Sequence, residues 1–134
     1  MYLLDTNVVS ELRKPRPNRD VVVWLEGVAD SELHVSAVTL GEIQAGIELT
    51  RQQDPAKAAQ LEAWADLLAA SYNLLSMDAT CFRRWARLMH RQSGTVYEDA
   101  MIAATAHVHN LIVVTRNVRD FARFDVQVLN PFAQ

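Results

Sequence analysis

The stretch LIVVT at residues 111–115 decides the fold, because it is the clearest β-strand in the sequence. Its first four residues are apolar and mostly β-branched, with no alternation between apolar and polar positions. Such a run is expected of a strand whose two faces are both covered by helices, as in a parallel sheet. Shorter segments predict further strands at residues 2–4, 33–36, 72–75 and 126–129.

Segments with helical spacing lie between these strands. The apolar residues Leu61, Trp64, Ala65 and Leu68, for example, follow Pro55, which suits the first turn of a helix. The alternation of strands and helices favours an α/β fold, a three-layer α/β/α sandwich with a central, mostly parallel β-sheet. Helices are predicted at residues 7–12, from about residue 18, at 38–50, from residue 55, at 79–91 with Gly94 ending that helix, and at 97–109.

The length and composition fit one domain over residues 1–134. Half of the 134 residues are apolar and 22% are charged, which is ordinary for a globular protein and too apolar for a disordered chain. Cys81 is the only cysteine, so no intramolecular disulfide and no zinc site with paired cysteines can form, and a cytoplasmic location is expected. The chain reaches Asp5 too early for a signal peptide, and no apolar run approaches a membrane span.

The charges are unevenly distributed along the chain. The formal net charge is −3, but residues 1–78 carry 6 Lys and Arg against 12 Asp and Glu, whereas residues 79–134 carry 7 Arg against 4 acids. The late arginines would suit the phosphates of RNA, or they simply pair with surface acids. Those on the helix predicted at 79–91 recur at helical spacing, and the others follow the strand at 111–115: Arg83, Arg84, Arg87, Arg91, Arg116, Arg119 and Arg123.

The acidic residues can be sorted by a rule for open α/β sheets, whose ligands bind beyond the carboxyl ends of the strands near a topological switch point. Asp5 directly follows the first strand, and Asp99 lies in the first turn of a predicted helix. Asn117 and Asp120 follow the strand at 111–115. Glu42 lies within a helix, where it either points inward or is an ordinary exposed glutamate.

Carboxylates brought together repel one another, so a cation is their natural partner. Mg²⁺ prefers oxygen ligands, keeps several waters and is commonly bound through one or two carboxylates together with phosphate oxygens. Such a site suits the hydrolysis of phosphodiester bonds, because the metal lowers the pKa of water and screens the leaving oxygen.

Four motifs in order along the chain carry a family resemblance. They are LLDTNVVSEL at residues 3–12, SAVTLGEIQAGI at 36–47, EDAMIAATA at 98–106 and VVTRNVRDF at 113–121. With these motifs the chain resembles the PIN-domain ribonucleases, and within them the VapC toxins of toxin-antitoxin pairs, especially the FitB-like branch. The resemblance covers nearly the whole chain and implies the PIN-like form of the α/β/α sandwich.

The resemblance also implies the site residues. It assigns the metal-binding acids to Asp5, Glu42 and Asp99, with Mg²⁺ as the ion and Mn²⁺ as a possible substitute, and it gives Thr6 or Thr115 a supporting role. Many family members carry an aspartate where this chain has Asn117, which brings no charge and leaves a second ion in question. Asp120, three residues later, either compensates as a catalytic residue or caps the next turn.

The implied activity is that of a metal-dependent endoribonuclease, the toxin of a pair inhibited by a VapB/FitA-like antitoxin. The resemblance further implies an RNA substrate, a homodimer and no membrane association. Trp24, Trp64 and Trp85 provide either dimer surface or core. A phosphoaspartyl fold is excluded because it needs a late lysine, whereas the only lysines are Lys14 and Lys57. The Asn117 departure keeps open a non-catalytic PIN module that binds RNA or protein.

Overall fold

The computed structural model describes residues 1–92 and 94–132, and within them a parallel sheet forms the centre of the fold. The strand order is β3-β2-β1-β4-β5, and each of the strand pairs is parallel. The predicted α/β fold is therefore confirmed. The strands are β1 (Tyr2–Leu4), β2 (Leu33–Ser36), β3 (Asn73–Leu75), β4 (Ile112–Val114) and β5 (Val128–Leu129).

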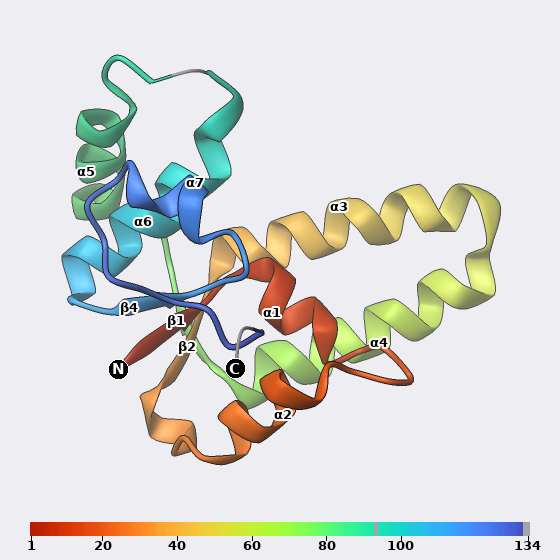
Figure 1. Ribbon diagram of the computed structural model, residues 1–134. Coiled ribbons are helices and arrows are strands. Elements are labelled where there is room, and N and C mark those ends of the chain that lie inside the picture. Colours follow the sequence, from red (N-terminus) through yellow and green to blue (C-terminus); the bar gives the residue numbers. More distant parts are fainter. Residues whose placement is uncertain (93, 133–134) are drawn as a thin grey trace.

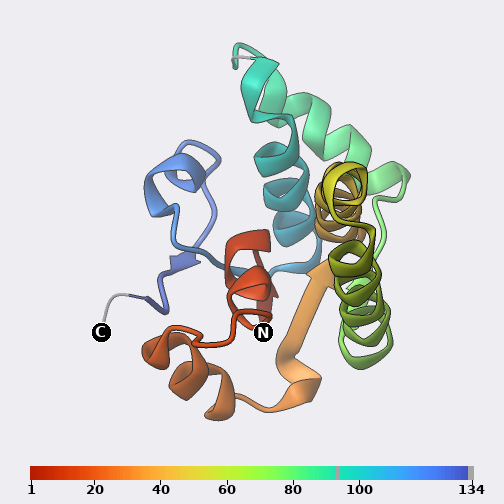
Figure 2. The same ribbon diagram turned by 90° about the vertical axis from the view of Figure 1, so that its right-hand side faces the viewer.

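Helices cover the sheet on both faces (Figure 1). Helices α3 and α4 pack against each other and extend away from the sheet as one arm, while α5, α6 and α7 are grouped on another side of the molecule, with α6 packed against the sheet (Figures 1 and 2). The helices are α1 (Thr6–Glu11), α2 (Arg19–Glu26), α3 (Ala37–Gln53), α4 (Pro55–Ser71), α5 (Ala79–Met89), α6 (Tyr97–His109) and α7 (Val118–Ala122), with short 3-10 helices η1 (Asp30–Glu32) and η2 (Gly94–Val96).

The alternation of side chains along the strands separates two cores. Leu3 and Val113 are fully buried on one face, in a cluster with residues of α6 and α7. Their neighbours Leu4 and Val114 are fully buried on the other face, together with residues of α1, α2 and α4. Successive residues of a strand point to opposite faces, so a strand without polar alternation is buried on both sides. The three tryptophans are partly buried against these clusters rather than fully exposed.

Side chains cap the starts of most helices. Asn18 and Asp78 accept hydrogen bonds from the backbone N–H groups of Val21 and Cys81, which explains where α2 and α5 begin. The end of α5 differs from the prediction, because the helix stops at Met89 and Gly94 does not end it. In the segment after α5 it is Arg91 that adopts a left-handed φ, of 68°, while Gly94 begins η2.

Two further differences from the prediction concern element lengths. Helix α3 extends three residues beyond the predicted end at residue 50, to Gln53. Helix α7 was not predicted, because its five residues are too few for a hydrophobic period to show. Among residues 1–92 and 94–132, no helix is long and apolar enough to cross a membrane.

The strand order sets the switch point of the sheet between β1 and β4. After β1 the chain builds β2 and β3 on one side, and it later returns on the other side with β4 and β5. The segments that follow β1 and β4 therefore begin side by side and diverge. This is the position at which open α/β sheets bind their ligands.

Candidate acidic site at the switch point

Asp5 is held in one orientation at the end of β1. Its side chain is only 5% exposed, and it is the N-cap of α1, accepting a 2.8 Å hydrogen bond from the backbone N–H of Thr6. Its other oxygen accepts hydrogen bonds from the Thr115 hydroxyl at 2.8 Å and the Asn7 amide at 3.2 Å. A carboxylate has about four lone-pair sites, so about one remains free for a ligand.

Thr115, fully buried at the end of β4, connects the two strands of the switch point. Its hydroxyl donates to Asp5 and accepts hydrogen bonds from the Asn7 side chain at 3.2 Å and from the backbone N–H of Asn117 at 2.9 Å. Asn7 in turn accepts a 3.2 Å hydrogen bond from the backbone N–H of Arg116. Asn7 was not selected from the sequence, although its place two residues after Asp5 in the first motif was a usable signal.

Glu42 directs its carboxylate toward this cluster. Although the side chain as a whole is exposed, Oε1 accepts a 2.9 Å hydrogen bond from the Thr6 hydroxyl. The pKa of Glu42 is raised, first by desolvation and then by the negative charges of Asp5, Glu98 and Asp99, against the lowering effect of Thr6. The alternative of an ordinary exposed helix glutamate is therefore not what the structure shows.

Among the acids of the site, Asp99 has the largest pKa shift. It lies half-buried in the first turn of α6, and its pKa rises from 3.8 to about 6. Desolvation is the main cause, followed by repulsion from Asp5 and Asp120, while Arg123 opposes the shift. Burial likewise raises the pKa of Asp5, against its hydrogen bonds, and the charge of Asp120 adds to the effect. Four segments of the chain thus bring carboxylates within electrostatic reach of one another.

Asn117 and Asp120 have different places in this arrangement. Asn117 is exposed at the start of α7, and its side chain makes no capping hydrogen bond. Asp120 lies one turn later, is less exposed, and is near enough to Asp5 and Asp99 to affect both pKa values. Its closest cation is Arg123, at 3.9 Å. The charge of Asp120 thus acts on the cluster, whereas no hydrogen bond joins the Asn117 side chain to these carboxylates within residues 1–92 and 94–132.

The donor set fits a hydrated divalent cation. In the described part of the chain, no three His, Cys, Asp or Glu side chains are already placed so that they could hold a metal ion. The site offers oxygen donors only, and the pKa values of Asp5, Glu42 and Asp99 are raised first by desolvation, with repulsion from neighbouring carboxylates adding to it. Mg²⁺ needs only one or two carboxylates because waters and phosphate oxygens complete its shell.

The cationic stripe predicted from Arg84, Arg87 and Arg91 is interrupted. Arg84 is partly buried, its Nη1 lies 3.1 Å from Nδ1 of His107, and its Nε is buried without a hydrogen-bond partner. The other ring nitrogen of His107 lies 2.8 Å from the carbonyl oxygen of Phe124, just beyond α7. Arg84 therefore links α5 to α6, Arg87 is exposed on α5, and Arg91 is exposed beyond the end of that helix, so the predicted stripe does not continue to it.

The fold and the site together define a parallel α/β protein with an acidic cluster at its switch point. A match to the PIN domain covers residues 2–127. The chain belongs to the PIN-domain family.

Relatives of known name extend over nearly the whole chain. The plasmid stability protein StbB of Pseudomonas syringae pathovar tomato is 37% identical, over 98% of this chain and 99% of that protein. The VapC ribonuclease Y4jK of Sinorhizobium fredii is 33% identical, over 98% of each. The toxin FitB of Neisseria gonorrhoeae is 32% identical, over 98% of this chain and 99% of its own length. The crystal structure of FitAcB from the same organism superposes with a TM-score of 0.88 at 32% identity, covering both chains completely.

Proposed function

We propose that this protein is a Mg²⁺-dependent endoribonuclease and the toxin of a toxin-antitoxin pair, with residues 1–134 acting as one PIN domain. One observation supports the proposal: the charge of Asp5 raises the pKa values of Glu42 and Asp99, and the charge of Asp120 raises those of Asp5 and Asp99, although the four acids come from four segments. The names of the relatives, a VapC ribonuclease, a toxin and a plasmid stability protein, support it.

Within this proposal three of the acids bind the metal ion. Asp5, Glu42 and Asp99 hold the ion, and Mn²⁺ can replace Mg²⁺. When bound, the metal lowers the pKa of a water molecule and screens the charge that develops on the leaving oxygen. The hydrogen bonds from Thr115, Asn7 and Thr6 keep Asp5 and Glu42 from turning away when substrate enters.

Asp120 supplies the fourth negative charge in place of Asn117. Its effect on the pKa values of Asp5 and Asp99 is what an acid beside the metal would have. Asn117 then contributes its backbone N–H to Thr115 and is a catalytic residue only if its amide reaches a water molecule. This division favours an active enzyme over a non-catalytic PIN module.

The proposed partners follow from the same cluster. RNA phosphates would approach the ion, and a VapB/FitA-like antitoxin would inhibit by placing an arginine against the carboxylates, because a guanidinium pairs with carboxylates in bidentate fashion. A homodimer and a cytoplasmic location complete the proposal.

Cleavage of structured RNA by the purified protein tests the function. We expect cleavage with Mg²⁺ or Mn²⁺, none with excess chelator, and none from Asp5→Ala, whereas the exposed Asp66→Ala on α4 should cleave normally. Metal-dependent cleavage that survives Asp5→Ala would refute the site. Binding of RNA without cleavage of tRNA, rRNA or mRNA would instead support the non-catalytic module.

A further inference from the structure

A cavity of about 330 Å³ lies between α1, α3 and α4 and opens beside the acidic site. Two of its lining residues, Thr6 and Glu42, are joined by the 2.9 Å hydrogen bond described above, so the cavity and the cluster share a wall. Ile43 and Trp64 contribute apolar surface to the cavity. Its volume is within the range of small-ligand sites.

The α1 side of the cavity is polar and ends in a cation. Thr6, Ser10 and Arg13 follow one another at helical spacing along α1 and the turn after it, and all three line the cavity. Arg13 is exposed, and within the described residues its guanidinium makes no ion pair or hydrogen bond. A free cation beside a strongly acidic site is the group an anionic ligand needs, because the carboxylates alone would repel it.

The α3 wall of the cavity contains a glycine that the packing of the protein does not require. Gly46 lines the cavity from the middle of α3, where a glycine costs about 0.5–1 kcal/mol relative to alanine. A Cβ added at Gly46 would meet no atom within 4 Å, so the chain's own packing does not demand a glycine. Its backbone is accessible to a ligand.

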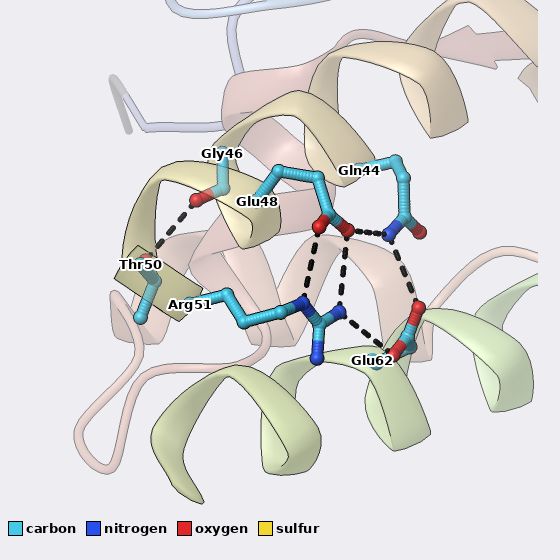
Figure 3. Close-up of polar contacts among 6 residues, drawn as sticks. All are labelled: Gln44, Gly46, Glu48, Thr50, Arg51 and Glu62. Carbon is cyan, nitrogen blue, oxygen red and sulfur yellow. Dashed lines mark hydrogen bonds and ion pairs between the residues drawn. The ribbon is translucent and has the colours of Figure 1, made fainter. Parts of the chain in front are cut away.

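A polar network holds the two long walls together (Figure 3). Arg51 of α3 donates to Glu48 at 3.0 Å and reaches across to Glu62 of α4 at 2.9 Å, and Gln44 joins the same two glutamates at 2.7 and 3.1 Å. Arg51 holds the pKa values of both glutamates below their usual range. Because the network fixes α4 against α3, the cavity has a set width before a ligand enters.

We propose that this cavity binds one unstacked nucleotide of the RNA substrate, next to the phosphate that is cleaved. The inference rests on the proposed ribonuclease function and names a subsite for it. The base lies against Trp64, and a flanking phosphate pairs with Arg13. Aromatic side chains stack on bases of any sequence for about 1–3 kcal/mol each, and single-stranded or loop nucleotides can leave their stack to enter such a site.

An RNA nucleotide is favoured over a protein side chain as the ligand because the cavity is continuous with the acidic cluster. Because Glu42 lines the cavity, a strand whose phosphate lies at Glu42 can place a neighbouring nucleotide at the shared wall. The charges agree as well, since Arg13 is the cationic group of the cavity lining and the flanking phosphate is anionic. The subsite would therefore select RNA that is single-stranded beside the cleavage point.

Binding of a short fluorescent oligoribonucleotide, measured by anisotropy, tests the proposal. Ca²⁺ in place of Mg²⁺ screens the carboxylates, so the readout is affinity rather than cleavage. We expect Gly46→Leu, which fills the cavity, to weaken binding at least tenfold, and Gly46→Ala, which adds a single methyl group, to weaken it far less. Ala45→Leu, on the neighbouring surface and outside this cavity, is the matched control and should also bind normally.

Two further variants locate the nucleotide. Arg13→Gln should lower affinity and reduce the slope of affinity against salt by about 0.7, whereas Arg16→Gln, in the exposed loop outside the cavity, should leave the slope unchanged. The oligoribonucleotide should quench tryptophan fluorescence in wild type and in Trp85→Phe but not in Trp64→Phe, a change small enough to preserve packing.

The outcomes separate the subsite from the catalytic function. Equal affinities for Gly46→Leu and Gly46→Ala, or full quenching in Trp64→Phe, would overturn the subsite even if the enzyme cleaves RNA. If Gly46→Leu binds RNA normally but no longer binds an antitoxin protein, the cavity is a protein site and the proposal is overturned. Cavity-dependent RNA binding by a protein that does not cleave would support the subsite and refute the ribonuclease.

Discussion

Replacing Asp99 by asparagine should stabilise the metal-free protein at neutral pH, because the change removes a carboxylate that the fold holds with a raised pKa. The pKa of Asp99 rises from 3.8 to about 6. The folded state therefore binds this proton more tightly than the unfolded chain does. The protonated carboxyl costs no stability below about pH 4, and stability falls as the pH rises through 6 and the group ionises.

The magnitude follows from the same values. A difference of about two pH units corresponds to about 3 kcal/mol as an upper bound. Asp99 is only half-buried, so solvent screening reduces the expected effect to about 1–2 kcal/mol. The free energy of unfolding of Asp99→Asn should exceed that of wild type by this amount above pH 7 and equal it near pH 4.

Urea unfolding with chelator present, at intervals from pH 4 to pH 8, measures the effect. Asp66→Asn, an exposed acid on α4, is the control and should show no such difference. Added Mg²⁺ or Mn²⁺ should reverse the order at neutral pH, because wild type binds the ion and the variant binds it weakly. A gap between wild type and Asp99→Asn that does not change with pH would refute the reasoning, as would a less stable variant at pH 7 without metal.

Three other predictions concern the surroundings of the cluster. Asp120→Asn should lower Mn²⁺ affinity in titration calorimetry by about 10 to 100-fold, whereas Asn117→Ala should leave it nearly unchanged; the reverse order would return Asn117 to the metal site. Thr115→Val should cost about 1–3 kcal/mol in urea unfolding, because Asp5 and two other groups lose their partner, and Thr115→Ser should recover most of that loss. Arg87→Ala with Arg91→Ala should lower the salt dependence of RNA affinity by about 0.7 for each phosphate that an arginine no longer neutralises, and an unaltered slope would show that these arginines do not bind RNA.

The strands and most helices were predictable because they depend on local pattern. The apolar run at residues 111–115 requires burial on both faces, and the two cores with Leu3 and Leu4 on opposite sides meet that requirement. The positions of Asp5 and Asp99 followed in the same way, since each lies at an element boundary that the pattern marks.

The remaining features depend on contacts between distant segments. The inward direction of Glu42 comes from Thr6, 36 residues away, and the partial burial of Arg84 comes with His107, 23 residues away. Neither partner is visible in local periodicity. The sequence could not tell whether Asp120 or Asn117 lies nearer the acidic cluster, because their positions depend on the five-residue helix α7, which local periodicity does not predict.

The central claim is that the converging acids form one metal-dependent site for RNA cleavage. The most direct measurement is the single-turnover rate of RNA cleavage at saturating Mn²⁺ for Asp5→Asn, Glu42→Gln and Asp99→Asn, beside wild type and Asp66→Asn. We predict that wild type and Asp66→Asn cleave at equal rates and that each of the three site variants loses nearly all activity while remaining folded. Cleavage at the wild-type rate by any of these three would contradict the account.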